Sequence, residues 1–285
     1  MANSVNTMHD KVCMVTGATS GIGLVTAQAL ARDGAKVIVV GRNPERGAAT
    51  VGRIQQETGN SAVELMVADL SVQAQVRQLA SEVQRRFAHI DVLINNAGAL
   101  FGQRQLTAEG IEMTFALNHL AYFLLTNLVL DRLSASASGR VVNVSSEAHR
   151  GARLDFSDLQ GEHRYRGWRA YAQSKLANIL FTYELARRLE GTGVVTNALH
   201  PGFVATNFGW NNRSVTAALW RILQLAAISP EQGAQTIIYL ASSAEVEDVT
   251  GKYFVKNKAV RSSEASCDRT VAERLWQVSA ELTGL

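Results

Sequence analysis

The stretch Thr16-Gly17-Ala18-Thr19-Ser20-Gly21-Ile22-Gly23 separates a short apolar run from a helical pattern that continues to Arg32. Glycines here allow the backbone to turn tightly and to approach a phosphate, and the N-terminus of a helix attracts anions. The spacing G-x-x-x-G-x-G differs from the common G-x-G-x-x-G, and a glycine-rich loop alone is a weak signal. Its place between a strand and a helix predicts a phosphate-binding loop rather than a mere tight turn.

Short apolar runs alternate with longer helical patterns along the chain. The runs are rich in Val and Ile, as expected for parallel strands buried on both faces. Strands are expected at Val12 to Thr16, Lys36 to Val40, Ala62 to Val67, Val92 to Ile94, Arg140 to Val144, Val194 to Leu199 and Tyr253 to Val255. Helices are expected at Gly21 to Arg32, Asn43 to Glu57, Val72 to Phe87, Glu112 to Leu133, Ala170 to Leu189 and Pro230 to Leu240. This α/β alternation predicts a single Rossmann-type domain over residues 1–285, with a doubly wound parallel sheet of about seven strands and helices on both faces.

The composition is globular, with 47% of the 285 residues hydrophobic and 19% charged. Because the net charge is only +3 and its Lys and Arg residues are scattered, no nucleic-acid partner is expected. Cys13 and Cys267 fit neither a disulfide framework nor a metal site, which predicts no metal and a reducing, cytoplasmic location. Residues 1–10 are polar, and the longest apolar stretch, Leu120 to Leu130, falls short of the ~20 residues of a membrane span, so no transmembrane segment is expected.

Five motifs, in order, resemble those of the short-chain dehydrogenase/reductase family. The first is the loop itself, which matches T-G-x-x-x-G-x-G. The others are Asp69-Leu70 after the third expected strand, Asn95-Asn96-Ala97-Gly98 at the fourth, Tyr171 and Lys175 as Y-x-x-x-K, and Pro201-Gly202 with Thr206 as P-G-x-x-x-T. The resemblance covers about residues 10 to 260. Any one motif arises by chance, but five in this order identify the chain as a member.

The resemblance implies a nicotinamide cofactor and hydride transfer between it and a carbonyl compound or alcohol. It places the cofactor on Gly17, Ser20, Gly21, Ile22, Gly23, Arg42, Asp69, Leu70, Asn96, Ala97, Gly98, Tyr171, Lys175, Pro201, Gly202, Val204 and Thr206. It makes Asn118, Ser146, Tyr171 and Lys175 the catalytic residues.

The end of the second expected strand indicates which nicotinamide cofactor is bound. An acidic residue about 20 residues after the glycines binds the ribose 2′-hydroxyl and repels a 2′-phosphate. Here the strand ends at Gly41 without an acid, and Arg42 follows. Because a guanidinium can pair with a 2′-phosphate, we expect NADP(H) rather than NAD(H). The alternative is that Arg42 is only a solvated loop residue.

Tyr171 and Lys175 lie four residues apart in an expected helix and therefore point to one face. A free tyrosine has a pKa of about 10, too high for efficient proton transfer at neutral pH. A nearby ammonium and an oxidised nicotinamide favour the phenolate, so we expect a lowered pKa for Tyr171. Tyr171 would protonate the carbonyl oxygen in reduction and deprotonate the alcohol in oxidation. The family resemblance adds that Lys175 holds the nicotinamide ribose. Without this context, an ordinary amphipathic helix would explain both residues.

Ser145 and Ser146 end the fifth expected strand, where a hydroxyl can bind the substrate oxygen. The family uses the second serine of such a pair, which selects Ser146. Asn118 lies inside an expected helix, where asparagine disfavours regular structure. The resemblance implies that Asn118 kinks this helix and holds a water that relays protons to Lys175; a polar face residue is the alternative.

A narrower resemblance connects the chain with the retinol dehydrogenase branch of the family. It is carried by Val144 to His149, Asp158-Leu159-Gln160, Tyr171 to Asn178 and Thr270 to Trp276. It implies an apolar aldehyde, ketone or alcohol as substrate. The chain lacks the N-terminal hydrophobic anchor of vertebrate members, which favours a soluble carbonyl reductase.

Two segments near the end of the chain receive their own expectations. Residues 203–228 are rich in apolar side chains and are expected to form a substrate lid, or else a helix packed on the core, on another subunit or on a membrane surface. Residues 266–285 are expected to form a helical tail.

Two other functions and the subunit count remain open at this stage. The chain fits a C=C reductase of the protochlorophyllide reductase type, or a sensor that binds NADP(H) without catalysis. Sensors often lose the tyrosine or the lysine, so the retained pair favours catalysis. The family commonly forms homodimers or homotetramers, often through the helix that bears Tyr171. Four side chains on that helix face either the core or a partner: Leu176, Ile179, Leu180 and Tyr183.

Overall fold

The structure is a computed structural model, and it describes residues 8–202 and 228–285. Eight strands form one sheet in the order β3-β2-β1-β4-β5-β6-β7-β8. The strands are β1 (Val12–Thr16), β2 (Lys36–Gly41), β3 (Val63–Val67), β4 (Val92–Asn95), β5 (Arg140–Val144), β6 (Val195–His200), β7 (Tyr253–Val255) and β8 (Lys258–Val260). All neighbouring strands pair in parallel except β7 and β8. The strand order reverses between β1 and β4, which confirms the doubly wound Rossmann-type sheet.

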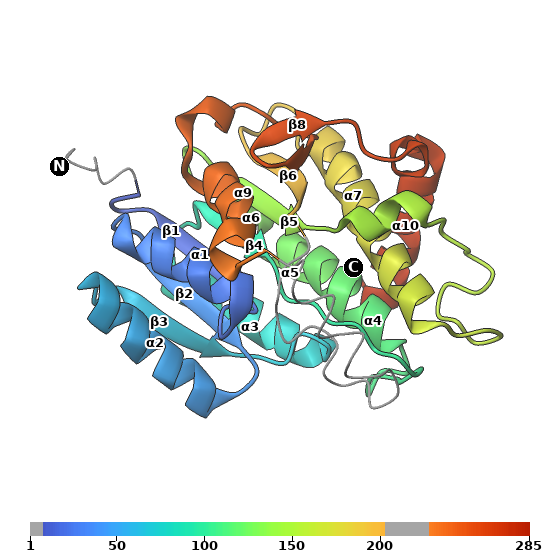
Figure 1. Ribbon diagram of the computed structural model, residues 1–285, viewed down its shortest axis with the longest axis horizontal. Helices are drawn as coiled ribbons and strands as arrows, with labels where there is room; N and C mark the ends of the chain where they lie inside the picture. The colour runs from blue at the N-terminus through green and yellow to red at the C-terminus, as the bar shows by residue number, and fades with distance from the viewer. Residues whose placement is uncertain (1–7, 203–227) are drawn as a thin grey trace.

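Helices cover both faces of this sheet (Figure 1). The longer ones are α1 (Gly21–Arg32), α2 (Pro44–Thr58), α3 (Gln73–Arg86), α5 (Ala121–Leu128), α7 (Gly167–Arg188), α9 (Pro230–Ser242) and α10 (Arg269–Thr283). The short ones are α4 (Met113–Phe115), η1 (Ala116–Leu120), α6 (Leu130–Ser134), η2 (Glu147–Gly151), η3 (Ala244–Val246) and η4 (Glu264–Cys267). Helices α1 and α9 pack together on one face, while α3 and α5 pack together on the other.

Successive side chains of the central strands enter opposite cores, as the pleat of a strand requires. On β1, Met14 joins the core beneath α3 and α5, whereas Cys13 and Val15 join the core beneath α1 and α9. On β2, Ile38 and Val39 divide in the same way. Both faces of the sheet are therefore shielded from water at these strands, which explains why their sequences are continuous apolar runs.

The helix expected over Glu112 to Leu133 is present but not regular: α4, η1 and α5 follow one another as continuous helical backbone from Met113 to Leu128, and Val129 separates α5 from α6. Glu112 stays outside the helix and caps it, since its carboxylate accepts hydrogen bonds from the amides of Thr114 and Phe115, both at 2.8 Å. The π-helical turn η1 then inserts an extra residue per turn around Asn118. At Val129 the backbone leaves the helical region, with ψ at 11°, and separates α5 from α6.

The sheet also has one strand more than the sequence indicates. Strand β8 is three exposed residues long and pairs antiparallel with β7. Lys256 and Asn257 make the two-residue turn with φ of 49° and 61°. Because β8 has no buried face, it leaves no apolar pattern, and only Asn257 in the turn signals a hairpin.

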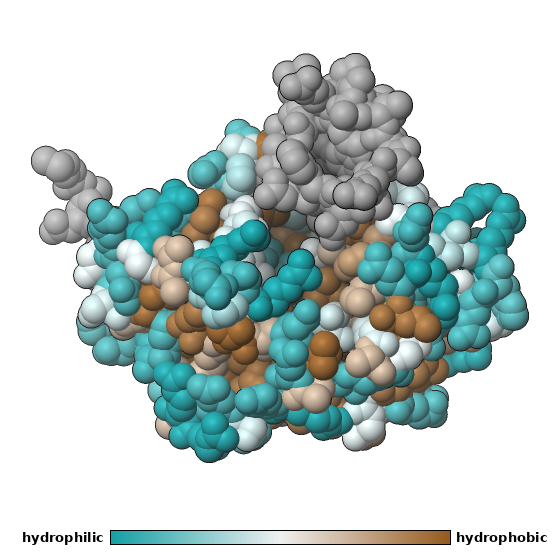
Figure 2. All heavy atoms as spheres, turned by 90° about the horizontal axis from the view of Figure 1, so that it is seen from below, coloured by the Kyte–Doolittle hydropathy of each residue, from teal (hydrophilic) through white to brown (hydrophobic). Residues whose placement is uncertain are grey.

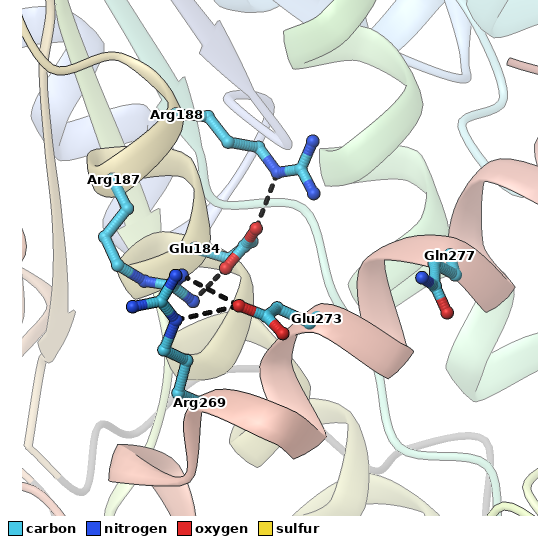
Figure 3. A pocket seen from close by; sticks show the side chains of 6 residues that line it. All are labelled: Glu184, Arg187, Arg188, Arg269, Glu273 and Gln277. Atoms are coloured by element: carbon cyan, nitrogen blue, oxygen red, sulfur yellow. Dashed lines mark hydrogen bonds and ion pairs between the residues drawn. The ribbon is translucent and has the colours of Figure 1, made fainter.

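The C-terminal helix α10 lies along α7, where charged side chains line an open pocket (Figure 3). The buried carboxylate of Glu184 pairs with Arg187 and Arg188. Glu273 of α10 pairs with Arg187 at 3.4 Å and with Arg269 at 2.8 Å. None of the residues expected at the active site lines this pocket. Its charges already pair with one another and fasten α10 to α7.

Aromatic packing completes the contact of α10 with the body of the molecule. Trp276 lies 4.9 Å from Phe123 of α5 and 5.8 Å from Phe181 of α7, measured between ring centroids. Three of the four α7 side chains that the sequence leaves between core and partner are buried in this chain: Leu176, Ile179 and Leu180. Tyr183 is partly exposed, and its hydroxyl bonds to that of Ser262 at 2.8 Å.

The surface seen from below separates hydrophilic from hydrophobic residues (Figure 2). Hydrophilic residues cover most of the rim of the molecule, and hydrophobic residues gather toward its middle. Among the helices of residues 8–202 and 228–285, none has both the length and the apolarity needed to cross a bilayer. The same residues contain no cluster of three or more His, Cys, Asp or Glu that could hold a metal ion. Cys13 is buried and Cys267 is exposed, both as free thiols.

Candidate active site

The expected site residues that the structure describes follow the carboxyl ends of neighbouring parallel strands or lie on helices packed beside those ends. After the strands come the phosphate loop (β1), Arg42 (β2), Asp69 and Leu70 (β3), Asn96 to Gly98 (β4), Ser146 (β5), and Pro201 and Gly202 (β6). On the helices lie Asn118 (η1) and Tyr171 and Lys175 (α7). Since parallel strands share one carboxyl edge, these residues gather at one side of the sheet, where doubly wound folds bind their ligands.

The loop after β1 has the shape that a pyrophosphate needs. Gly17 has a φ of 65°, and a Cβ there would lie 2.9 Å from the backbone of Ala97. A Cβ on Gly23 would lie 2.4 Å from the carbonyl oxygen of Gly17. Ser20 precedes α1 but makes no side-chain capping bond, so it leaves the first-turn amides of α1 to an anion. The residues present therefore fit the phosphates of a dinucleotide.

The loops after β1 and β4 are fastened together at the point where the strand order reverses. The hydroxyl of Thr16 accepts hydrogen bonds from the amides of Asn96 at 2.8 Å and Ala97 at 3.1 Å. The side-chain amide of Asn96 donates to the carbonyl oxygen of Thr16 at 2.8 Å. Asn96 and Ala97 thus form part of the wall of the phosphate loop. Thr16 is not among the residues expected at the site, although its position before the first glycine is a visible signal.

The ends of β2 and β3 lie side by side and carry the residues that are expected from the sequence to distinguish NADP(H) from NAD(H). Gly41 pairs with Val67 in register, and Arg42 is exposed directly after Gly41. A Cβ on Gly41 would lie 2.5 Å from Cγ2 of Thr19. An acidic side chain at this strand end would therefore require the side chain of Thr19 to move. Asp69 accepts bonds from the amide and the hydroxyl of Ser71, at 3.0 and 2.7 Å.

Ser146, Tyr171 and Lys175 come together between β5 and α7. Tyr171 is buried, with 7% of its surface exposed, and the side chain of Ser146 lies close enough to lower its pKa. The Lys175 nitrogen lies 5.7 Å from the centroid of the Tyr171 ring. It donates a hydrogen bond of 3.0 Å to the carbonyl oxygen of Val144. The expected triad is thus assembled around one small volume beside the end of β5.

The expected lowering of the pKa of Tyr171 is wrong for the protein alone. Burial raises the pKa of Tyr171 to about 12, and the hydrogen bond from Ser146 opposes this rise only in part. Burial also lowers the pKa of Lys175 to about 7. Sequence spacing places the lysine near the tyrosine but cannot show that both are buried. Desolvation therefore decides the direction of both shifts.

The structure separates the two serines that the sequence places side by side. Ser145 is buried and its hydroxyl donates to the carbonyl oxygen of Lys175 at 2.7 Å, so it fastens β5 to α7. Ser146 is partly exposed and its hydroxyl reaches Tyr171. Only Ser146 is therefore placed to meet a substrate oxygen beside the tyrosine, which agrees with the choice made from the sequence.

Asn118 connects the loop after β4 with the helix of Tyr171. Its side chain accepts a bond from the amide of Ala99 and donates one to the carbonyl of the same residue, both at 2.9 Å. It also donates to the hydroxyl of Ser174 at 3.0 Å, and that hydroxyl donates to the carbonyl oxygen of Tyr171 at 2.7 Å. Ser174 is not among the residues expected at the site, and its place inside Y-x-x-x-K is the signal that the sequence offers for it.

Part of the expected cofactor and substrate region lies outside the described residues. Val204 and Thr206 belong to the undescribed segment, as does the proposed lid at residues 203–228 apart from Ile228. Gly202 is described and has a φ of 95°. A Cβ there would lie 2.4 Å from Cδ1 of Ile228, so Gly202 allows the chain on both sides of that segment to approach closely.

Comparison with known proteins agrees with this arrangement. Residues 11–216 match the family model described as short chain dehydrogenase. The chain is 43% identical to retinol dehydrogenase 12 of Mus musculus over 96% of this chain and 87% of the mouse protein. It is 35% identical to an uncharacterized protein of Mycobacterium paratuberculosis, with a TM-score of 0.79 and coverage of 97% and 94%. It is 26% identical to a short chain dehydrogenase of Escherichia coli CFT073 complexed with NADPH, with a TM-score of 0.71 and coverage of 90% and 100%. The chain belongs to the short-chain dehydrogenase/reductase family, and it is an oxidoreductase related to the retinol dehydrogenases.

Proposed function

We propose that this chain is an NADP(H)-dependent oxidoreductase that interconverts an apolar aldehyde or ketone and its alcohol, with Tyr171 as the general acid and base. The observation that carries the proposal is the position of Lys175, whose side-chain nitrogen lies 5.7 Å from the centroid of the Tyr171 ring, with Ser146 beside the same tyrosine. These groups lie at the same sheet edge as the phosphate loop. This arrangement suits proton transfer to a carbonyl oxygen beside a nicotinamide.

The chain's own residues would bind and protonate the substrate oxygen. When bound, the cofactor supplies the hydride, which adds to the carbonyl carbon. The hydroxyl of Ser146 donates a hydrogen bond to the carbonyl oxygen and stabilises the negative charge that develops on it. The hydroxyl of Tyr171 donates its proton to the same oxygen, and Lys175 stabilises the phenolate that remains. In the reverse direction, Tyr171 takes the proton from the alcohol.

NADP(H) is the cofactor that the described residues favour. The first-turn amides of α1 and the close approach of Gly17 to Ala97 fit the pyrophosphate. Arg42 offers a guanidinium at the end of β2, and Gly41 beside it presents no carboxylate that would repel a 2′-phosphate. The Escherichia coli relative complexed with NADPH supports the same choice.

An apolar substrate is supported by the surface beside Tyr171. Trp168 lies one turn before Tyr171 on α7, is 64% exposed, and has its ring centroid 5.8 Å from that of the tyrosine. An indole in this place offers an apolar face to a substrate that approaches the hydroxyl. The relatives named retinol dehydrogenase add support for an apolar carbonyl compound or alcohol.

The first experiment is a panel of apolar aldehydes and ketones, including retinal, assayed by the loss of NADPH absorbance with NADH as the control. We expect turnover of at least one carbonyl substrate, with NADPH preferred. The Tyr171→Phe variant is the matched control, because it keeps the ring and removes only the acidic hydroxyl. Its kcat should fall by roughly 10²- to 10⁴-fold while NADPH binding persists.

Two results would redirect the proposal. Tight NADPH binding without turnover of any carbonyl would favour a C=C reductase or an NADP(H) sensor. An assay with a conjugated C=C substrate then separates the two, because only the reductase would oxidise NADPH. An unchanged kcat in Tyr171→Phe would remove the tyrosine from the reaction.

A further inference from the structure

His149 lies three residues after Ser146 on η2 and is fully buried, although the proposed mechanism gives it no role. Its Nδ1 lies 2.7 Å from the carbonyl oxygen of Ser146. Its Nε2 accepts a hydrogen bond of 3.2 Å from the amide of Ser263, in the segment between β8 and η4. We propose that His149 is a positioning residue, which anchors the backbone of Ser146 to that segment and so holds the Ser146 hydroxyl against Tyr171. The inference rests on the proposed function, in which Ser146 binds the substrate oxygen.

The two partners of His149 fix its protonation. A backbone carbonyl only accepts hydrogen bonds, so Nδ1 must carry a proton to bind that of Ser146. A backbone amide only donates, so Nε2 must present its lone pair to Ser263. The ring is therefore neutral with its proton on Nδ1. A second proton on Nε2 would point at the amide proton of Ser263 and break the anchor.

The same segment also reaches the helix of Tyr171. The hydroxyl of Tyr183, on α7, bonds to that of Ser262 at 2.8 Å. Arg150 of η2 donates to the carbonyl oxygen of Arg261 at 3.0 Å. Residues 261–263 thus tie the turn after Ser146 to α7. Because Tyr171 lies on α7, this tie keeps Ser146 and Tyr171 in register.

The charged and titratable groups around His149 favour its neutral form. Burial is the largest cause that lowers the pKa of His149, and Arg150 acts in the same direction while Glu147 opposes it. His200, at the end of β6, accepts a bond from the amide of Glu147 at 3.2 Å, and a positive charge on it would repel one on His149. Tyr253 of β7 packs its ring against His149 with centroids 4.9 Å apart.

Two substitutions separate the anchor from simple packing. His149→Phe keeps a ring against Tyr253 and removes both hydrogen bonds. His149→Asn returns an amide N–H near the position of Nδ1, where it can donate to the carbonyl of Ser146. We expect kcat to fall about ten- to a hundredfold in His149→Phe, with NADPH affinity unchanged, and to recover in large part in His149→Asn. Tyr253→Phe, which keeps the ring beside His149 and loses the hydroxyl that donates to the Glu147 carboxylate at 3.5 Å, leaves both bonds of His149 in place, serves as the control and should retain kcat.

The pH dependence of kcat gives a second readout. In the wild type, kcat should fall at a pH below the usual pKa of histidine, as Nε2 takes up a proton. Asparagine does not titrate, so His149→Asn should lack this acid limb. An identical acid limb in the two proteins, or a His149→Phe variant that keeps full kcat, would overturn the proposal.

The tautomer can be read without any turnover. Nitrogen-15 NMR of the histidine rings in the cofactor-free protein, with His149→Asn used to assign the signal, should show the proton of His149 on Nδ1. A proton on Nε2 would overturn the inference even if the enzyme reduces carbonyls. Conversely, a wild-type protein with the expected tautomer but no carbonyl turnover would contradict the proposed function and leave the anchor itself established.

Discussion

The side-chain nitrogen of Lys175 lies 3.0 Å from the carbonyl oxygen of Val144, the last residue of β5 before the serine pair. This bond holds the lysine inside the molecule, where only 3% of its surface is exposed. One hydrogen bond to a neutral carbonyl does not compensate for the desolvation of an ammonium group. Burial therefore lowers the pKa of Lys175 to about 7. The buried position that places Lys175 beside Tyr171 therefore destabilises the folded protein when the lysine is charged.

Replacement of Lys175 by methionine should make the protein more stable at neutral pH and abolish efficient turnover. The pKa of the lysine is 10.5 in the unfolded chain and about 7 in the folded protein, so the unfolded chain binds more protons between these values. The free energy of unfolding of the wild type should therefore rise from about pH 7 to about pH 10.5 relative to the variant. At pH 7 the variant should be more stable by on the order of 3 to 5 kcal/mol. Denaturant unfolding of both proteins across this range measures the difference, and parallel curves would contradict the buried lysine.

Ser145 and Ser146 form a matched pair for mutation to alanine. Ser146→Ala removes the hydroxyl beside Tyr171 and should lower kcat by roughly 10²- to 10³-fold. Its stability should fall by about 1 kcal/mol, because the same hydroxyl caps η2 by accepting a bond of 3.3 Å from the amide of Ala148. Ser145→Ala removes the buried bond to the carbonyl of Lys175 and should cost about 1 to 3 kcal/mol of stability with a much smaller effect on kcat. Steady-state kinetics and denaturant unfolding of the two variants give both quantities. The reverse pattern would show that the first serine is the catalytic one.

Thr19 controls whether an acidic residue can be introduced at Gly41. Its methyl carbon lies 2.5 Å from the place of a Cβ on Gly41, so Gly41→Asp alone should strain the cofactor loop. Thr19→Ser removes that methyl group and makes room. We expect the double variant Gly41→Asp with Thr19→Ser to shift the ratio of NADPH to NADH affinity toward NADH by at least about tenfold, because a carboxylate repels the 2′-phosphate. Cofactor titrations of the single and double variants test this, and Arg42→Ala serves as a comparison that loses NADPH affinity without gaining NADH affinity.

The sheet and the phosphate loop could be predicted from the sequence because both rest on local patterns. Buried parallel strands are apolar on both faces, and β5 and β7 were located at their full length for this reason. Strand β8 left no such pattern, since all its residues are exposed.

The segment around Asn118 shows why helix boundaries were harder to predict. Its residues are almost all buried, so the sequence reads as one long apolar helix with no polar face to mark a change. The π-helical turn η1 accompanies bonds from the Asn118 side chain to Ala99, which lies 19 positions earlier in the chain. Contacts of that range leave no periodic signal in one sequence.

The spacing of the catalytic motif located Tyr171, Lys175 and Ser146 but not their ionisation. Four residues on a helix place two side chains on one face, whatever covers that face. The pKa shifts follow from burial against β5 and Tyr122, which only the fold provides. His149 shows the same limit, because its partner Ser263 is 114 positions away.

His119 should make the protein sensitive to mild acid. Its ring is fully buried near Phe115 and Phe181, and its Nε2 lies 2.9 Å from the hydroxyl of Ser279 on α10. Burial lowers the pKa of His119 from 6.5 to about 4. Between these two pH values, His119 is protonated in the unfolded chain but neutral in the folded protein. The free energy of unfolding should therefore fall as the pH drops from about 6.5 toward 4, by about 3 kcal/mol in all.

The variant His119→Gln isolates this contribution from the other histidines. Glutamine keeps a polar group toward Ser279 but does not titrate, and His149 and His200 remain in both proteins. The difference in unfolding free energy between wild type and variant should be constant above about pH 7. It should shrink or change sign as the pH falls to 4, because only the wild type contains a histidine that is protonated in the unfolded chain and neutral in the folded protein. A difference that stays constant over the whole range would mean that His119 accepts its proton in the folded state, and that α10 does not seal the core around η1.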